Sequence, residues 1–362
     1  MVEAGAVFQP RNCRQSAIIT LMLAVSALAL HLTWHSCPPL PEARAGMLAT
    51  VLKATVRKAT LLKDRPVYAG GSYWENGTKR WSRRCDSFDM RKQQWVACEP
   101  LPSSRADSAA VALEGRTIFL GGTSEGRVLR DVVSFDGRHW KDEPALRLPA
   151  PRAYAQAARQ GDRLFFFGGL TSAGDPATAT GQVWMLNLKT PANGWQTVAQ
   201  LPEPVRCLNA FTSDAEAAYF LGGVRSLGKS IENRREIWRY HFTDNRWSQM
   251  PDLPEASRAG SAVRVAEGLL YLGGYTDAFS RKVILLRLPE RTMEVIGELP
   301  GGVADSRFVQ VGGRLFFAGG ESGIKIRTAQ AWEGIRTMSE AAVGDEKASG
   351  GALRIVQSEF AE

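Results

Sequence analysis

VYAGG at residues 67–71 is the first of six copies of one pattern, a short apolar run that ends in a glycine pair. The later copies read IFLGG at 118–122, FFFGG at 165–169, YFLGG at 219–223, LYLGG at 270–274 and FFAGG at 316–320. From one first glycine to the next, the intervals are 51, 47, 54, 51 and 46 residues. A repeat period of about 50 residues indicates a fold built from equivalent units.

The second unit shows most clearly what one repeat contains. It predicts a strand from Ser108 to Leu113, a turn at Glu114–Arg116, and a return strand from Thr117 into the glycine pair. A loop then leads to a third strand at 132–135 and a fourth at Trp140. The spacing therefore predicts four short antiparallel strands in each unit.

Two further features recur in register with the glycine pairs. A Leu-Pro dipeptide with a nearby arginine opens four units, at Leu101-Pro102 with Arg105, Leu148-Pro149 with Arg152, Leu201-Pro202 with Arg206, and Leu253-Pro254 with Arg258. Return-strand tryptophans follow at 95, 140, 195 and 247. We expect them to pack between neighbouring units. The first unit lacks a good opening motif, and the sixth has Ala304 in the arginine position.

These features together resemble Kelch repeats, over roughly Leu48 to Met338. The resemblance implies an all-β, six-bladed Kelch-type propeller of four-stranded antiparallel blades, at residues 47–340. Each glycine pair then lets the chain turn where a side chain would collide. The ring must close, because closure hides the sheet edges. Either terminus could supply the closing strand, including the strand-like stretch 352–357 in a polar tail at 341–362.

Residues 1–46 form a distinct segment. Arg11 and Arg14 precede an apolar run at 17–32, and an Ala-x-Ala site ends at Ala45. This pattern predicts a signal peptide cleaved after Ala45, or an uncleaved signal-anchor helix. Both place the rest outside the cytosol, periplasmic or secreted, with membrane contact only through this segment. The net charge of +8 favours anionic partners. Because the charges are scattered and the chain is expected to be exported, nucleic acid is not expected.

Two cysteines flank the first hairpin. Cys85 and Cys98 fall opposite each other about a turn centred between Arg91 and Lys92. An exported compartment permits a cross-strand disulfide between them, the alternative being two free thiols.

The predicted ligand face is where the first strands begin and the second strands end. Arg105, Arg152, Arg206 and Arg258 share this face with the loops that follow the glycine pairs. They could grip an anion, or serve as scaffold by bonding loop carbonyls. Aromatic residues of the loops, Trp74 and Tyr275 among them, suit a sugar ring or a protein partner, or pack loop against loop.

Catalytic candidates are few. The sequence has no histidine, cysteine or carboxylate cluster with metal spacing, so neither metal nor cofactor is expected. The loop GGESGIKIR at 319–327 is similar to one in the periplasmic N-acetylneuraminate epimerases (sialic acid mutarotases), which are six-bladed Kelch propellers. The similarity implies that Glu321 relays a proton and Arg327 grips a sugar carboxylate; the alternative is an ordinary loop acid.

The sequence thus supports two functions of different kinds. The first is a non-catalytic recognition module, exported or membrane-tethered, for a protein or an anionic carbohydrate. The second is a cofactor-free sugar mutarotase or epimerase.

Overall fold

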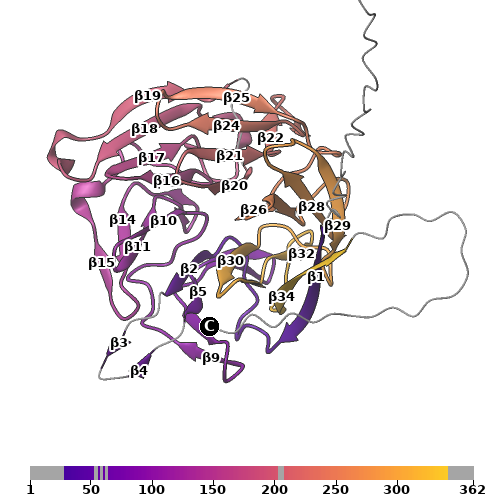
Figure 1. Ribbon diagram of the computed structural model, residues 1–362. Coiled ribbons are helices and arrows are strands. Elements are labelled where there is room, and N and C mark those ends of the chain that lie inside the picture. The colour runs from indigo at the N-terminus through magenta and orange to yellow at the C-terminus, as the bar shows by residue number, and fades with distance from the viewer. Residues whose placement is uncertain (1–27, 53–55, 58–59, 62–63, 203–207, 341–362) are drawn as a thin grey trace, which may run out of the picture. The chain divides into compact units, whose positions relative to one another are not determined.

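The computed structural model describes residues 28–52, 56–57, 60–61, 64–202 and 208–340. Within them, six four-stranded antiparallel sheets surround one axis (Figure 1). The predicted all-β, six-bladed propeller of four-stranded antiparallel blades is thereby confirmed. The compact unit that holds the propeller runs from Leu30 to Thr337.

Each blade is written from its innermost strand outward, and the blades are lettered along the chain. Blade A has β2 (Leu48–Leu52), β5 (Arg65–Ala69), β8 (Cys85–Asp89) and β9 (Gln94–Ala97). Blade B has β10 (Ala109–Leu113), β11 (Arg116–Leu120), β14 (Val132–Phe135) and β15 (Trp140–Asp142). Blade C has β16 (Gln156–Gln160), β17 (Arg163–Phe167), β18 (Gln182–Asn187) and β19 (Gln196–Gln200).

The second half of the ring repeats this order. Blade D has β20 (Ala210–Ser213), β21 (Ala217–Leu221), β24 (Ile237–His241) and β25 (Arg246–Met250). Blade E has β26 (Ser261–Val265), β27 (Gly268–Leu272), β28 (Lys282–Arg287) and β29 (Met293–Glu298). Blade F has β30 (Arg307–Val311), β31 (Arg314–Ala318), β34 (Ala331–Glu340) and, as its outermost strand, β1 (Leu28–Cys37).

Short elements decorate the blades. Two-stranded ladders are formed by β3 (Val56–Arg57) with β4 (Thr60–Leu61), β6 (Ser72–Glu75) with β7 (Thr78–Trp81), β12 (Thr123–Ser124) with β13 (Arg127–Val128), β22 (Val224–Ser226) with β23 (Ile231–Asn233), and β32 (Glu321–Gly323) with β33 (Ile326–Arg327). The only helices in the described part of the chain are single 3-10 turns, η1 (Pro144–Leu146), η2 (Pro176–Thr178) and η3 (Pro191–Asn193).

The ring is closed by the N-terminal strand β1. Leu30 is buried in one apolar cluster with Leu285 of blade E and Leu315 of blade F. The indole of Trp34 meets the ring of Phe317 edge-on at a centroid distance of 5.5 Å. Burying a leucine side chain contributes about 1.5–3 kcal/mol, so β1 is an integral part of blade F. The tail stretch 352–357 lies outside the described residues.

The prediction of an N-terminal helix finds no support, because residues 28–37 form a strand. Along β1 the side chains alternate between partly buried (Leu32 and Trp34) and exposed (His31, Thr33 and His35). Such alternation has the period of a strand with one covered face. No helix in the described ranges is long and apolar enough to cross a membrane. Residues 1–27 are not described, and removal of a leader stays a prediction.

Glycine pairs join neighbouring blades, and they stand where a side chain would collide, as predicted. Gly122 of blade B donates its N–H to the carbonyl of Arg152, which leads into blade C, at 2.7 Å. A Cβ on Gly121, whose φ is +60°, would lie 2.3 Å from that same carbonyl oxygen. At the closure the pattern recurs, with Gly320 of blade F bonded to the carbonyl of Arg44 at 2.8 Å. Only glycine permits this close approach.

The tryptophans also join blades, as expected. The indole of Trp140 in blade B donates to the carbonyl of Glu99 after blade A at 2.8 Å. In the same way Trp195 of blade C bonds Arg147 O at 3.0 Å. The equivalent partner of Trp95 in blade A is Pro38 O at 2.8 Å. Pro38 therefore lies where an interblade linker belongs.

Candidate functional site

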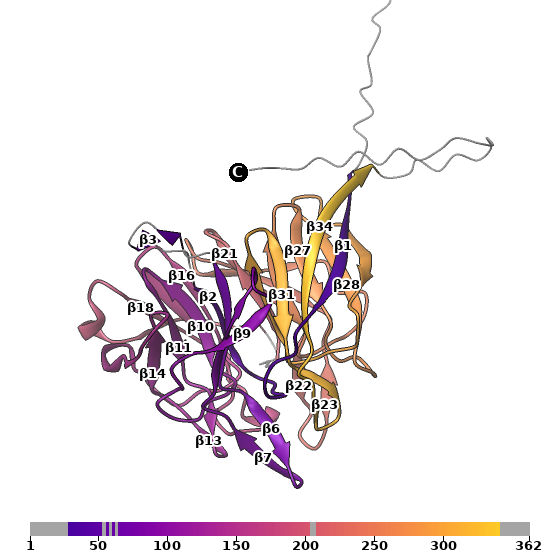
Figure 2. The ribbon, with the colours of Figure 1, turned by 90° about the horizontal axis from the view of Figure 1, so that it is seen from below.

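The loops that follow the glycine pairs gather at one end of the ring. Figure 2 shows the ladders β6–β7 and β22–β23 at the same end, opposite β3. In five of the six blades, the loop is held to the segment that enters its blade by an isolated bridge, for example Ala106 to Thr123 and Ala304 to Glu321. The predicted shared face therefore exists, and we call it the loop face.

A cavity of about 380 Å³ opens on the loop face near the axis. Loops and entering segments of five blades contribute to it, all except blade B. Its polar lining comes from Lys79, Tyr154, Arg258, Tyr275, Asp305, Glu321 and Arg327. Four predicted site residues, namely Arg258, Tyr275, Glu321 and Arg327, thus share one cavity.

The predicted catalytic pair forms an ion pair on the cavity wall. Glu321 and Arg327 face each other across the β32–β33 ladder, and Nη1 of Arg327 donates to Oε1 of Glu321. The Arg327 side chain is only 8% exposed, whereas that of Glu321 is 28% exposed. Arg327 Nε also donates to the carbonyl of Ser72 in blade A at 3.3 Å. The arginine is therefore fixed from two sides, and the carboxylate faces the cavity.

Arg258 and Tyr275 form a second wall. The guanidinium carbon of Arg258 lies 4.2 Å from the centre of the Tyr275 ring. Its Nη1 donates to Oδ1 of Asn233 at 2.6 Å. Phe279 meets Tyr275 edge-on at 5.1 Å. A cation stacked on an aromatic ring beside a second ring offers both a charge and an apolar surface to a ligand.

Two of the predicted ligand arginines are scaffold. Arg105 is 1% exposed, and it donates to Gly121 O at 2.7 Å and to the carboxylate of Asp131. Burial lowers the pKa of its guanidinium. Arg152 donates to Oε1 of Gln182 at 2.7 Å and lies over the Trp184 ring. Neither residue lines the cavity, and Arg206 lies outside the described residues.

A third scaffold arginine, Arg44, escaped the sequence analysis. It is 0% exposed, donates to Gly70 O at 2.8 Å and pairs with Asp86 Oδ2 at 2.7 Å. It opens blade A as Arg105 opens blade B. The signal was present as Leu40-Pro41 followed by Arg44. The leader prediction for residues 1–46 includes that motif.

Arg258 reaches the cavity because it stands one residue beyond the scaffold position. In five of the six pairs, among the residues that the structure describes, the second glycine donates its N–H to the carbonyl of that position. The position is Ser257 after blade D and Val303 after blade E. A small or an apolar residue thus replaces arginine at the scaffold position. After Ser257 the next residue is Arg258, which forms the isolated bridge with Tyr275.

Trp74 lies away from the cavity. It sits on β6, half-buried, with the Lys325 ammonium 4.8 Å from its ring centre. The contact joins the β6–β7 and β32–β33 ladders, so Trp74 packs loop against loop.

The cavity floor is a ring of backbone bonds that the sequence analysis missed. Its members, all with φ between 49° and 64°, are Gly46, Asp107, Tyr154, Leu208, Ala259 and Asp305. Five of the six links are hydrogen bonds from one blade's entering segment to the next, such as Asp107 N to Gly46 O at 2.9 Å. The twin triplets Ala106-Asp107-Ser108 and Ala304-Asp305-Ser306 could have shown that two acids occupy equivalent places.

Cys85 and Cys98 lie opposite each other, as predicted, and Cys98 N donates to Cys85 O at 2.8 Å. Both are thiols in the structure. The hydrogen bond from the Cys85 thiol lowers the pKa of the Cys98 thiol and raises that of Cys85. A disulfide stays a prediction. Within the described ranges, no three histidine, cysteine or acidic side chains are grouped to hold a metal ion.

Comparison with known proteins supports the class of fold. No family model matches the chain. Kelch-like protein 35 of Mus musculus is 23% identical over 225 residues, which are 61% of this chain and 36% of that protein. Alpha-scruin of Limulus polyphemus is 28% identical over 161 residues, 42% of this chain and 17% of that protein. The chain therefore matches well under half the length of these two relatives.

A solved structure agrees with the fold over nearly its whole length. The structure of YjhT superposes with a TM-score of 0.64 at 14% identity, covering 82% of this chain and 95% of that one. With the six described blades and the repeats in register, this chain is a six-bladed β-propeller whose sequence is similar to Kelch-like proteins.

Proposed function

We propose that this propeller is a recognition module that binds a small carboxylate-bearing carbohydrate in the axial cavity of its loop face. The observation that carries the proposal is the meeting of Arg258, Tyr275 and Arg327 around one space of about 380 Å³. Small-molecule sites span about 300–1,000 Å³ and combine apolar surface with a few polar groups.

The two walls suit different parts of such a ligand. The Tyr275 and Phe279 rings offer a surface for the apolar face of a sugar ring. Arg258 and Lys79 add positive charge, and Lys79 Nζ lies 4.0 Å from Asp107 Oδ2. A guanidinium can bond a carboxylate through two parallel N–H groups. The ligand's carboxylate is therefore placed near Arg258, and its hydroxyls near Glu321.

Binding is tested by saturation-transfer NMR and calorimetry with N-acetylneuraminate and glucuronate, and with N-acetylmannosamine as a ligand without a carboxylate. We expect the two acids to bind, and Arg258→Met to weaken them at least tenfold. The matched control is Arg127→Met, an exposed arginine of β13 on the same face. Equal affinity for the acids and the neutral sugar would contradict the proposal.

A second candidate, a cofactor-free mutarotase, is favoured by the Glu321 carboxylate on the cavity wall. Held by Arg327, it could accept the proton of the anomeric hydroxyl and deliver it to the ring oxygen as the ring carbon–oxygen bond breaks. Reversal of both transfers on the other face of the carbonyl group closes the ring as the other anomer. NMR exchange between the anomers of N-acetylneuraminate tests this. Loss of the accelerated exchange in Glu321→Gln, with binding kept, is the expected result. Binding without accelerated exchange in the wild type would leave recognition alone.

Exposed apolar side chains at the tips of the β22–β23 and β32–β33 ladders favour a protein as an alternative ligand of the loop face. Ile324 and Ile326 of blade F and Leu227 of blade D are 76%, 60% and 54% exposed. If no small acid binds, a protein ligand on these tips becomes the better account. We also propose an extracytoplasmic location, periplasmic or secreted, on the strength of the leader pattern. Cell fractionation tests it.

A further inference from the structure

Asp305 lies on the cavity floor in a fixed backbone position. Its N–H donates to Ala259 O at 2.8 Å, and its carbonyl accepts from Gly46 N at 3.3 Å. The side chain lines the cavity together with Glu321 and Arg327. A ligand that enters between the two walls must therefore meet this carboxyl group.

A second carboxylate, Asp107, faces Asp305 across Gly46. A Cβ on Gly46 would lie 2.2 Å from Asp107 Oδ1 and 3.3 Å from Asp305 Oδ2, so little more than one methyl group would fit between them. Two carboxyl groups this close do not both ionise readily, because each charge opposes the other.

The partners of the two acids decide which one keeps the proton. Asp107 is 2% exposed and accepts a hydrogen bond from Thr123 Oγ1 at 2.9 Å, and Lys79 Nζ lies 4.0 Å away. Tyr154 faces both acids, and its side-chain hydrogen bond goes to Asp107 rather than to Asp305. A proton shared by the two acids is therefore better held by Asp305.

The surroundings of Asp305 agree with that assignment. Burial and then the charge of Asp107 raise the pKa of Asp305 to about 7, with Glu321 acting in the same direction. Arg307 and Arg327 act in the opposite direction and do not cancel the rise. Lys79 faces the pair from blade A, on the Asp107 side.

We propose that Asp305 binds the ligand as a neutral carboxylic acid, so that the cavity takes up an anionic ligand together with a proton. The inference rests on the proposed binding of a carboxylate-bearing carbohydrate. An ionised Asp305 would repel that carboxylate, whereas the protonated form donates a hydrogen bond to the ligand.

The test is calorimetry of N-acetylneuraminate binding to the full chain at pH 6, 7 and 8, in buffers of different ionisation enthalpy. The ligand's carboxylate stays ionised throughout this range. We expect the apparent Kd to rise about tenfold from pH 6 to pH 8, because the binding-competent fraction falls by that factor. Proton uptake should accompany binding near pH 7.5. Because this measurement uses the wild-type protein, its outcome does not depend on whether a variant folds.

Two variants locate the effect. Asp305→Asn keeps the shape and a donor, and its binding should be independent of pH without proton uptake. Glu321→Gln removes the other carboxylate on the cavity wall and should keep a pH dependence, moved to lower pH because Glu321 helps to raise the pKa of Asp305. Binding that does not change with pH in the wild type, or a pH dependence that survives Asp305→Asn, would overturn this inference alone. No binding of any acid at any pH would overturn the proposed function with it.

Discussion

The two halves of the loop face use arginine in opposite ways. In blades A to C, the arginines that open the blades are buried and bonded to carbonyls and carboxylates of their own blades. In blades E and F, Arg258 and Arg327 line the cavity. The difference arises from position, since Ser257 and Val303 occupy the scaffold place in the second half. A residue's place in the blade, and not its type, thus separates scaffold from ligand contact.

The largest effect is expected from deleting the N-terminal residues that complete blade F and open blade A. Deleting residues 1–45, the segment predicted to be a leader, also removes β1 and Arg44. Blade F would lose its outermost strand, and blade A its buried arginine. We expect no cooperatively folded protein, judged by thermal unfolding and by protease resistance.

The native protein gives a parallel test. If export removes a leader, mass spectrometry of the mature N-terminus should find residues 28–45 retained. A stable, monomeric mature chain that begins at Gly46 would contradict the role of β1 as the closing strand.

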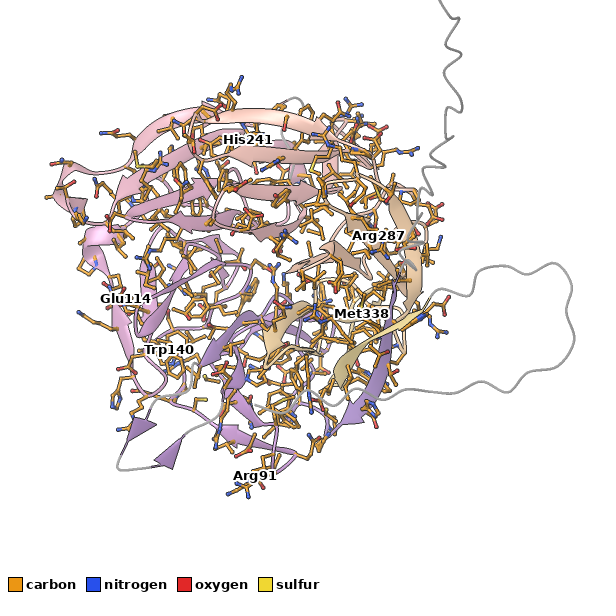
Figure 3. All side chains as sticks on the ribbon, in the orientation of Figure 1. Arg91, Glu114, Trp140, His241, Arg287 and Met338 are labelled. Atoms are coloured by element: carbon orange, nitrogen blue, oxygen red, sulfur yellow. The ribbon has the colours of Figure 1, made fainter. Side chains whose placement is uncertain are left out.

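The next largest effect is expected for Arg44→Ala. The variant leaves Asp86 buried with only Arg84 as its partner, and leaves the carbonyl of Gly70 without its donor. Breaking a buried pair in this way costs about 3–5 kcal/mol of unfolding free energy. Urea denaturation measures it, with Arg91→Ala as the control. Arg91 lies on the outer rim (Figure 3), and its loss should change stability by no more than about 0.5 kcal/mol.

A smaller effect concerns the pH dependence of stability. The folded pKa of Asp305 lies above the ordinary value of about 3.9. The folded state therefore binds more protons than the unfolded state between about pH 4 and pH 7, and stability falls as the pH rises through this window. Because Asp305 remains partly open to the cavity, we expect a loss of on the order of 2 kcal/mol. Urea midpoints at pH 5 and pH 8 should show it, and Asp305→Asn should lack it. A stability that rises over this range in the wild type but not in the variant would reverse the assignment.

The smallest effect is expected from the cysteine pair of blade A. A disulfide between Cys85 and Cys98 closes a short loop on a hydrogen-bonded strand pair, so we expect about 1 kcal/mol of added stability in an oxidising compartment. Diagonal peptide mapping without reductant should show a linked pair. Two alkylatable thiols in protein taken from its native compartment would exclude it.

Repetition explains how much of this molecule could be predicted. The glycine pairs, Leu-Pro dipeptides and tryptophans recur with the period of a blade, so the strands and the shared loop face followed from sequence. The Glu321–Arg327 pair was implied by the likeness of the loop at 319–327 to that of the N-acetylneuraminate epimerases, and the structure places the two residues opposite each other across one small ladder. What repetition cannot show is position across the ring. Asp107 and Asp305 are almost 200 residues apart and meet only after six blades close.

The start of the chain was harder for a different reason. The apolar residues of β1 run on from those of the leader pattern, and composition does not separate a signal core from a strand. The alternation of Leu30, Leu32 and Trp34 with polar residues and the motif ending at Arg44 carried the information. The sequence analysis left Arg258 open between anion contact and scaffold, together with Arg105 and Arg152. The signal that separates it is its spacing, since Arg258 stands 15 residues before its glycine pair, whereas Arg105 and Arg152 stand 16 before theirs.

The most direct test of the contrast between the two halves measures stability and affinity together on Arg105→Met and Arg258→Met. The account predicts that Arg105→Met lowers the urea midpoint and leaves the Kd of the folded protein for N-acetylneuraminate unchanged. It predicts the reverse for Arg258→Met, an unchanged midpoint and a Kd raised at least tenfold. A Kd that responds to Arg105 and not to Arg258 would contradict the account.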